Sequence, residues 1–500
     1  MNVSHFIERA AKLFPEKTAI VFEERQIAYR QLNETVNRLA NAFRGNGVGI
    51  GDRIALHLPN IPEFAVCYLA AQKIGAMAVS VSPMLTAKEL AYILQDSGAV
   101  LACTTEDLLP NLPLSECPEL RQVLVCEGEG QGHPTIGKWL EKASGELRAA
   151  DLDRNTPAAL LYTSGTTGFP KGAILSHGNV VSNIYTTAHH AGFTPEDRMS
   201  LFLPAFHVFG QNFVMNATFL SCATLVMYRR FEPDKVLASI GRDRVTMFFA
   251  VPTIYINLLN MDLSAYDLSS IRYDFSAAAT MPKEISTRWT ERFGRRVYEG
   301  YGLTECSPFA CYNHDFVHKF GSVGTPVENV EIKILDEDDN EVAPGTWGEI
   351  GIKGPGVMQG YWKRPEETAA ALRSGWLHSG DTGTLDDDGY VYIVDRVKDM
   401  VNVAGFKVYP AEIEQVLYRH PAVQELAIFG VPHEQKGEIV KAAVVLQKGK
   451  SVTREEILSF CRENMASYKV PTEIAFVDEL PKSATGKILK RVLRDEDAAK

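Results

Sequence analysis

A loop rich in glycine and hydroxyl side chains spans residues 162–172 and reads Y-T-S-G-T-T-G-F-P-K-G. Glycines let backbone N–H groups approach an anion, Ser and Thr hydroxyls donate to it, and Lys171 adds positive charge. The loop is not a Walker loop, because the G-x-x-x-x-G-K-[ST] spacing is absent and Pro170 precedes the lysine. A flexible linker is the alternative, but apolar stretches that resemble strands flank the loop. We therefore predict that this loop wraps a polyphosphate.

Further polar side chains lie far apart in the sequence, each at the end of an apolar run: His207, Thr304, Glu305 and Asp381. Open α/β sheets usually bind ligands where their strands end, so these groups are candidates for one shared site. Taken singly, each has a structural explanation. His207 fits a hydrogen-bonded core histidine, and Glu305 and Asp381 fit helix caps or turn residues. The residue types alone leave this choice open.

Composition limits the class of protein. The 500 residues are 45% hydrophobic and 23% charged, which is typical of a globular chain with more than one core. The net charge of −11 argues against nucleic-acid binding, because no basic stripe balances the acidic surface. Eight cysteines without C-x-x-C pairs indicate reduced thiols in a cytoplasmic protein, with neither a disulfide framework nor a zinc site. We expect no integral membrane segment, because the most apolar window, 61–81, is interrupted by Gln72 and Lys73 and no signal segment opens the sequence.

The elements that position these residues follow from hydrophobic periodicity. Helical spacing at 31–43, 63–75 and 87–95 alternates with apolar strand candidates at 53–58, 76–81 and 99–103, which predicts βαβ units and sheets covered by helices. The alternation continues to about residue 299. Beyond Gly324 the sequence becomes β-rich with turn signals, and beyond the charged segment 395–399 a compact α+β pattern follows.

The predicted fold class is therefore α/β. We expect a large N-terminal domain (1–395) with several helix-covered sheets plus a β-rich subdomain. A hinge (396–400) and a small, mobile α+β C-terminal domain (401–500) follow it.

Together these segments closely resemble the AMP-forming acyl-CoA synthetases of the adenylating superfamily, which also contains peptide-synthetase adenylation domains and firefly luciferase. The resemblance spans nearly the whole chain, and its motifs appear in the family's order. They are Y-T-S-G-T-T-G-F-P-K-G at 162–172, P-A-F-H-V-F-G at 204–210, Y-G-L-T-E at 301–305, G-D at 380–381, D-R-V-K-D at 395–399 and P-K-S-A-T-G-K at 481–487.

The resemblance implies a two-step reaction in which a carboxylate attacks the α-phosphate of Mg-ATP and a thiol then displaces AMP. The nucleophile is already ionised near pH 7, so the spreading phosphate charge needs neutralising more than the reaction needs a base. The β- and γ-phosphates would be held by Thr163, Ser164, Gly165, Thr166, Thr167 and Lys171. Glu305 would bind Mg²⁺ and Thr304 would contact the α-phosphate. The nucleoside would be held at the ribose by Asp381 and Arg396, and at adenine by Ala278, Glu299, Gly300 and Tyr301.

The resemblance also assigns roles to residues of both domains. His207 would orient the substrate carboxylate rather than act as an obligatory base. Lys487 would be a catalytic lysine that reaches the reacting oxygens only when the small domain closes. Lys398 matches the hinge position. In the family the small domain rotates between an adenylating pose and a thioester-forming pose. In the thioester-forming pose Gly405 would face the active site and let the pantetheine of coenzyme A pass.

A hydrophobic acid, fatty or otherwise, is the expected substrate, with His207, Ala277 and Phe213 at the acyl group. The nearby aromatics Phe206, Phe209 and Phe275 also fit ordinary core. Ala277 stands where relatives often have glycine, which narrows a pocket wall by a methyl group.

Four alternatives remain, and one of them, luciferase-like oxygenation, is not distinguished by the motifs. A fatty acyl-AMP ligase would pass the acyl group to an acyl carrier protein, but segment 306–324 has no room for the insertion such enzymes commonly carry, which favours coenzyme A. An amino-acid-activating domain would need an acidic residue near 211–213, where there is none. A non-catalytic nucleotide-binding relative would have no need for Lys487. A homodimer is possible.

Overall fold

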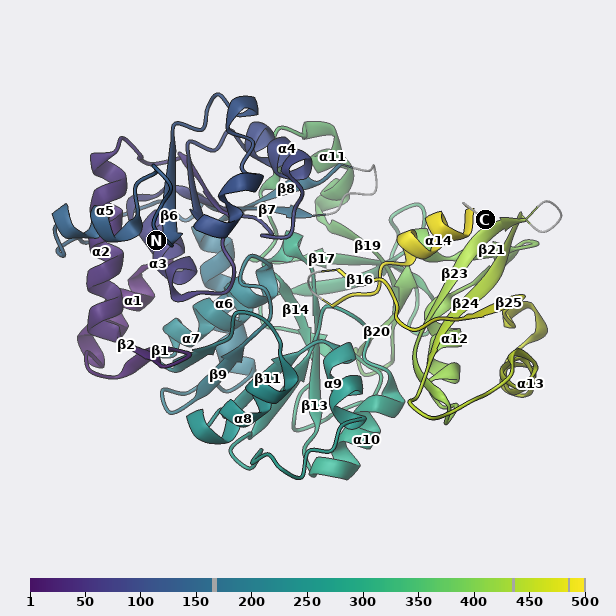
Figure 1. Cartoon of the computed structure of the whole chain (residues 1–500). Coiled ribbons are helices and arrows are strands. Elements are labelled where there is room, and N and C mark those ends of the chain that lie inside the picture. Colours follow the sequence, from purple (N-terminus) through teal and green to yellow (C-terminus); the bar gives the residue numbers. More distant parts are fainter. Residues whose placement is uncertain (164–168, 434–436, 484–485, 499–500) are drawn as a thin grey trace.

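The computed structural model describes residues 1–163, 169–433, 437–483 and 486–498, with the backbone alone for Lys398. Ser164, Gly165, Thr166 and Thr167, which we predicted to bind phosphate, lie outside the described residues. The described strands form four sheets (Figure 1). None of the described helices is long and apolar enough to cross a membrane.

The first sheet has seven strands in the order β18-β8-β7-β4-β3-β5-β6. Its strands are β3 (Arg53–Leu56), β4 (Met77–Ser80), β5 (Leu101–Thr105), β6 (Gln122–Glu127), β7 (Pro157–Thr163), β8 (Lys171–Ser176) and β18 (Gly360–Tyr361). Helices α3 (Pro62–Ile74) and α4 (Ala87–Ser97) cover opposite faces of this sheet. Strand residues that point to one face pack with α3 in one apolar cluster, and those that point to the other face pack with α4 in a second cluster. α3 starts with proline in its first turn and ends at Gly75, whose φ of 76° suits a left-handed C-cap.

The second sheet has nine strands in the order β15-β14-β13-β12-β11-β9-β10-β1-β2. Their bounds are β1 (Thr18–Phe22), β2 (Arg25–Ala28), β9 (Arg198–Leu201), β10 (Thr224–Met227), β11 (Met247–Ala250), β12 (Tyr273–Ser276), β13 (Val297–Gly302), β14 (Phe309–Tyr312) and β15 (Thr325–Pro326). β11, β12 and β13 run parallel, so their carboxyl ends meet at one edge. α9 (Pro252–Leu259) begins at Pro252 and α10 (Lys283–Phe293) begins directly after Pro282, positions at which proline suits the start of a helix.

Further helices complete the large domain. They are α1 (His5–Leu13), α2 (Tyr29–Gly45), α5 (Ile136–Lys142), α6 (His177–His190), α7 (Ala217–Leu220), α8 (Pro233–Asp243) and α11 (Pro365–Ala371), with a π-helical segment at Phe209–Asn216. α6 has a capping box in which the hydroxyl of Ser176 accepts a hydrogen bond from the backbone N–H of Asn179.

A β-rich subdomain follows, as predicted. It contains four antiparallel strands: β16 (Glu331–Leu335), β17 (Gly348–Lys353), β19 (Leu377–Leu385) and β20 (Val391–Arg396). The register of β19 with β20 sets Asp381 directly opposite Arg396.

The C-terminal part forms its own sheet and its own apolar clusters. Its strands are β21 (Val401–Val403), β22 (Phe406–Val408), β23 (Val423–His433), β24 (Gly437–Leu446) and β25 (Glu473–Phe476), and its helices are α12 (Pro410–Leu417), α13 (Arg454–Asn464) and α14 (Lys490–Ala498). The predicted fold class, a multi-sheet α/β domain followed by a separate α+β domain, is confirmed. The exact limits of the domains and hinge stay predictions.

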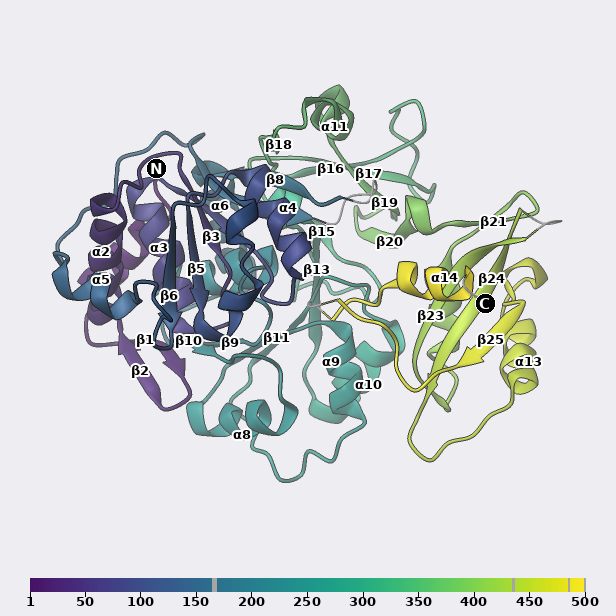
Figure 2. The ribbon, with the colours of Figure 1, turned by 45° about the horizontal axis from the view of Figure 1, so that its top comes forward.

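One segment of the small domain reaches the large one. In both Figure 1 and Figure 2 the yellow chain before α14 extends from the small domain towards β13. There the hydroxyl of Thr253 donates a hydrogen bond of 3.5 Å to the carbonyl of Gly486. The backbone N–H of Lys283 also donates to Oε1 of Gln415 (3.2 Å). The first contact holds Gly486, directly before Lys487, against the start of α9 at the carboxyl end of β11, and the second ties α12 of the small domain to α10.

Candidate active site

Glu305 lies at the junction of the two large sheets. It belongs to the short 3₁₀ turn Thr304–Cys306 that follows β13, and only 8% of it is exposed. Its Oε1 accepts hydrogen bonds from the hydroxyls of Thr163 (3.3 Å) and Tyr361 (2.9 Å). Nζ of Lys171 lies 5.5 Å from the centre of the Tyr361 ring. The structure thus brings Thr163 and Lys171, which flank the glycine-rich loop, to Glu305 and the neighbouring Thr304.

The base of the glycine-rich loop is anchored by a polar network around Asp96 at the end of α4. The hydroxyl of Tyr162 donates to Oδ2 of Asp96 (2.7 Å), and Arg364 pairs with Oδ1 (2.9 Å). The hydroxyl of Tyr92 donates to the carbonyl of Pro170 (3.2 Å). These bonds tie both ends of the loop to one helix, because Tyr162 is its first residue and Pro170 lies near its end.

Asp381 forms a second carboxylate site beside the first. Its Oδ2 accepts a hydrogen bond from the hydroxyl of Tyr301 (2.7 Å), and Nε of Arg396 lies 3.4 Å from its Oδ1. The side chain of Asp381 is 11% exposed. An oriented carboxylate of this kind can accept hydrogen bonds from a diol such as ribose.

The carboxyl ends of β12 and β13 form the wall between these groups. Ala277 and Ala278 follow β12, and Ala278 is exposed with a φ of 71°. Gly300 lies in a crowded position, since an added Cβ would come within 2.8 Å of both Phe275 and Phe309. A side chain at residue 300 would therefore push the β13 backbone out of line.

Glu299 lies on the same strand, but its side chain is covered. It is 4% exposed, and Oε1 has no hydrogen-bond partner among the described residues. Register places it opposite Ser276, whose Oγ likewise has no partner there. Burial raises the pKa of the Glu299 carboxyl to about 8, so this group is largely protonated at pH 7.

His207 lies where the two domains meet. Burial, together with the positive charge of Lys487, lowers the pKa of His207 to about 4, so its imidazole is neutral at pH 7. Nδ1 accepts a hydrogen bond from the backbone N–H of Phe209 (3.3 Å), which assigns the ring proton to Nε2. A lysine of the small domain is thus close enough to perturb a histidine of the large domain.

Phe213, predicted to contact the acyl group, is at the centre of an aromatic cluster. Its ring stacks on Phe275 with centroids 4.7 Å apart, and it meets Phe209 edge-on at 5.2 Å. Phe213 is 1% exposed. Ala277 is partly buried against the same apolar core. These rings bound any acyl pocket that extends beyond His207.

Gly405 is not brought to the site. It occupies an exposed two-residue turn between β21 and β22, where Ala404 and Gly405 both have positive φ (50° and 91°). In Figures 1 and 2, β21 lies on the small domain well away from β13. Lys398 belongs to a 3₁₀ turn between β20 and β21, and its side chain lies outside the described residues.

Sequence reasoning missed Tyr361 and Asp96. Tyr361 follows a glycine and pairs with β8 through the two-residue strand β18, a contact between segments far apart in the chain. No local pattern signals such pairing. The only hint was the aromatic and basic run Tyr361-Trp362-Lys363-Arg364 after a turn.

Two family models match this chain. Residues 7–362 match the AMP-binding enzyme model, and residues 412–487 match the AMP-binding enzyme C-terminal domain. The chain belongs to the AMP-binding enzyme family. A long-chain-fatty-acid–CoA ligase of Bacillus subtilis is 36% identical over 98% of this chain and 93% of its own length. The prediction of an AMP-forming acid–thiol ligase is confirmed.

Solved structures agree over the full length. An anthranilate CoA ligase, AuaEII, in complex with anthranoyl-AMP, superposes with a TM-score of 0.95 at 30% identity, covering 100% of this chain and 98% of that one. ATP-bound MatB from Rhodopseudomonas palustris gives a TM-score of 0.93 at 32% identity, covering 100% of both chains. The apo structure of MatB, with the same identity and coverage, gives 0.81.

Burial of Glu299 predicts a pH-dependent stability. Its pKa is about 8 in the folded chain and near 4.5 when unfolded, so its contribution is fully present below pH 4.5 and is lost as pH rises through 8. Glu299→Gln keeps a neutral side chain at every pH. We expect the variant and the parent to have similar melting temperatures at pH 5. At pH 8.5 the variant should melt at a higher temperature, because its free energy of unfolding should exceed that of the parent by on the order of a few kcal/mol.

The exposed neighbour Glu291→Gln on α10 serves as the control and should leave the pH profile unchanged. A Glu299→Gln profile parallel to the parent between pH 5 and 8.5 would show that Glu299 is ionised in the folded chain.

Proposed function

We propose that this chain activates a hydrophobic carboxylic acid with Mg-ATP to an acyl-adenylate and then transfers the acyl group to the thiol of coenzyme A. The observation that carries the proposal is that two domains meet at one site. The large domain supplies two hydrogen-bonded carboxylates, at Glu305 and Asp381, and the small domain supplies Lys487 beside His207.

Charge neutralisation dominates the first step. Lys171 and the residues of the glycine-rich loop hold the β- and γ-phosphates, and Thr304 contacts the α-phosphate. Lys487 stabilises the carboxylate and α-phosphate oxygens as negative charge spreads over them. The hard oxygen donors at Glu305 and Thr163 fit Mg²⁺, which when bound neutralises charge on the phosphates. No general base is required, because the attacking carboxylate is already ionised.

Two further groups orient the substrates. His207 is neutral, so its Nε2–H donates a hydrogen bond to the substrate carboxylate and its ring adds no charge. Asp381, aligned by Tyr301 and Arg396, accepts from the ribose hydroxyls. Adenine lies between Ala278 and the Glu299–Gly300–Tyr301 backbone, where Gly300 permits close approach.

The second step uses another arrangement of the domains. In this structure Lys487 lies near His207 of the site, whereas Gly405 lies far from the site. Thioester formation therefore requires the small domain (401–500) to rotate relative to the large domain (1–395). The hinge for this rotation is the segment 396–400, which includes Lys398. The MatB structures support this reading. The present chain superposes better on the ATP-bound form (0.93) than on the apo form (0.81), as expected of an adenylation pose.

The aromatic cluster around Phe213 and the methyl of Ala277 favour a hydrophobic acid. The named relatives, a long-chain-fatty-acid–CoA ligase and an anthranilate CoA ligase, support an apolar or aryl substrate and coenzyme A as acceptor. All eight cysteines are free thiols, which supports the cytoplasm as the working compartment. An acyl carrier protein as acceptor and a homodimer stay predictions.

The decisive test is Lys487→Ala. We expect acid-dependent ATP–pyrophosphate exchange to fall by about 10²–10³-fold, because the cation that stabilises the transition state is lost. ATP binding, measured by calorimetry, should be largely kept, since the phosphate loop and both carboxylates remain. Lys482→Ala in the same segment is the matched control; it breaks an ion pair with Glu425 (2.8 Å) within the small domain. Undiminished exchange in Lys487→Ala, or equal loss in both variants, would rule out the mechanism.

Tyr361→Phe tests how Glu305 is positioned. Without the phenol donor the carboxylate loses one of its two hydrogen bonds, so the Mg²⁺ concentration for half-maximal exchange should rise by about 10-fold while the rate at saturating Mg²⁺ is largely retained. Tyr266→Phe removes a similar tyrosine–carboxylate bond, to Asp234 (2.8 Å), on the surface and should change neither quantity. An unchanged Mg²⁺ dependence in Tyr361→Phe would show that Tyr361 does not position Glu305 for the metal.

A further inference from the structure

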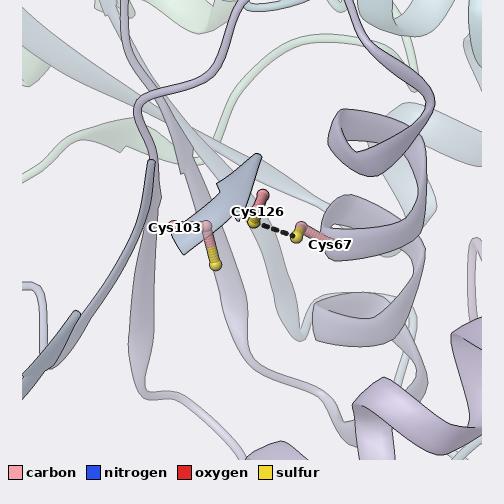
Figure 3. A group of neighbouring side chains, drawn as sticks. All are labelled: Cys67, Cys103 and Cys126. Carbon is pink, nitrogen blue, oxygen red and sulfur yellow. Dashed lines mark hydrogen bonds between the residues drawn. The ribbon is translucent and has the colours of Figure 1, made fainter. Parts of the chain in front are cut away.

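Three buried cysteines meet between helix α3 and the seven-stranded sheet. Cys67 lies on α3, Cys103 on β5 and Cys126 on β6 (Figure 3). The Sγ atoms of Cys67 and Cys126 are 3.6 Å apart, and all three Sγ atoms lie within 4.8 Å of one another. Among the described residues this is the one group of potential metal ligands found at such spacing, and it contains no histidine or carboxylate.

The strand register aims these thiols at one point. Cys103 is paired with Leu124, and Thr104 and Thr105 are paired with Val125 and Glu127. Cys126 is therefore the extra residue of a β-bulge, which turns it towards α3 on the same face as Cys103. Because the three cysteines are far apart in the sequence and form no C-x-x-C pair, their spacing could not reveal that they meet in the fold.

The surroundings decide which ion suits the site. Cys67 and Cys103 are fully buried, Cys126 is 6% exposed, and all three belong to the main apolar core. A net charge in such an environment is costly. Three thiolates around a monovalent cation leave a charge of −2, and around a divalent cation −1, whereas a trivalent ion gives a neutral complex. Zn²⁺ in addition prefers four ligands, and the group offers three.

We propose that Cys67, Cys103 and Cys126 form a binding site for a trivalent thiophilic ion, with arsenic(III) as its representative. Arsenous acid would react with the three thiols, As(OH)₃ + 3 RSH → As(SR)₃ + 3 H₂O, so three As–O and three S–H bonds break and three As–S bonds form. No oxidant is needed. Three sulfurs bound pyramidally to arsenic at bond lengths of about 2.3 Å lie about 3.5 Å apart. The 3.6 Å between Cys67 and Cys126 already matches this spacing, and the three Sγ atoms, all within 4.8 Å of one another, need only a small movement. Entry is at Cys126, the most exposed of the three, on the edge strand β6.

The test uses the reduced full-length protein with sodium arsenite under anaerobic conditions. Native mass spectrometry should show one arsenic atom gained and three hydrogens lost per chain. Cys67→Ala, Cys103→Ala and Cys126→Ala should each weaken binding at least 10-fold. The buried thiols Cys311 and Cys461 lie outside the group, so Cys311→Ala and Cys461→Ala serve as controls and should bind as the parent does.

Circular dichroism melting of each variant, recorded in parallel, separates loss of the site from loss of the fold. Binding, not catalysis, is the readout, so the result is independent of the proposed ligase activity. Absence of the arsenic adduct in the parent would overturn the proposal, as would full retention in any of the three site variants. Displacement of arsenite by an equal concentration of Zn²⁺ would overturn the charge argument.

Discussion

The proposed mechanism depends above all on one interaction, the positive charge that Lys487 of the small domain brings to a site built by the large domain. In that mechanism the large domain alone would hold the nucleoside and the phosphates but would lack the cation at the reacting oxygens. The anchored segment before α14, held by Thr253 at Gly486, brings that charge beside His207. The neutral state of His207 follows from the same arrangement, since burial and a nearby cation both disfavour a second positive charge.

Tyrosine hydroxyls orient three carboxylates in or near the site by donating hydrogen bonds to them. Glu305 accepts from Tyr361, Asp381 accepts from Tyr301, and Asp96 accepts from Tyr162. A phenol donates to one lone pair of a carboxylate without adding a charge of its own, so each carboxylate is held in a fixed orientation. Glu299 is the contrast. It is buried, none of the described residues donates a hydrogen bond to its Oε1, and its raised pKa of about 8 keeps it largely neutral at pH 7.

Local signals in the sequence predicted the elements well. Helical periodicity located α3 and α4, and apolar stretches located the strands on both sides of the glycine-rich loop, because these features depend on neighbouring residues. The resemblance of the motifs to the family predicted from the sequence alone that Glu305, Asp381 and Lys487 share one active site. Contacts between distant segments could not be predicted this way. Tyr361 reaches Glu305 through a two-residue strand, and Cys126 joins Cys67 and Cys103 through a bulge in register. The burial of Glu299 was also beyond sequence reasoning, because it depends on which face of β13 is covered.

The most direct measurement of the central claim is the pKa of His207 by NMR in the ligand-free protein and in Lys487→Ala. We expect a pKa of about 4 for His207 in the parent chain and a higher pKa in the variant, because one of the two causes of the lowered pKa is removed. The pKa of the buried His57, also about 4, has no contribution from Lys487 and should not move. An unchanged His207 pKa in the variant would contradict the claim that the small domain completes the site.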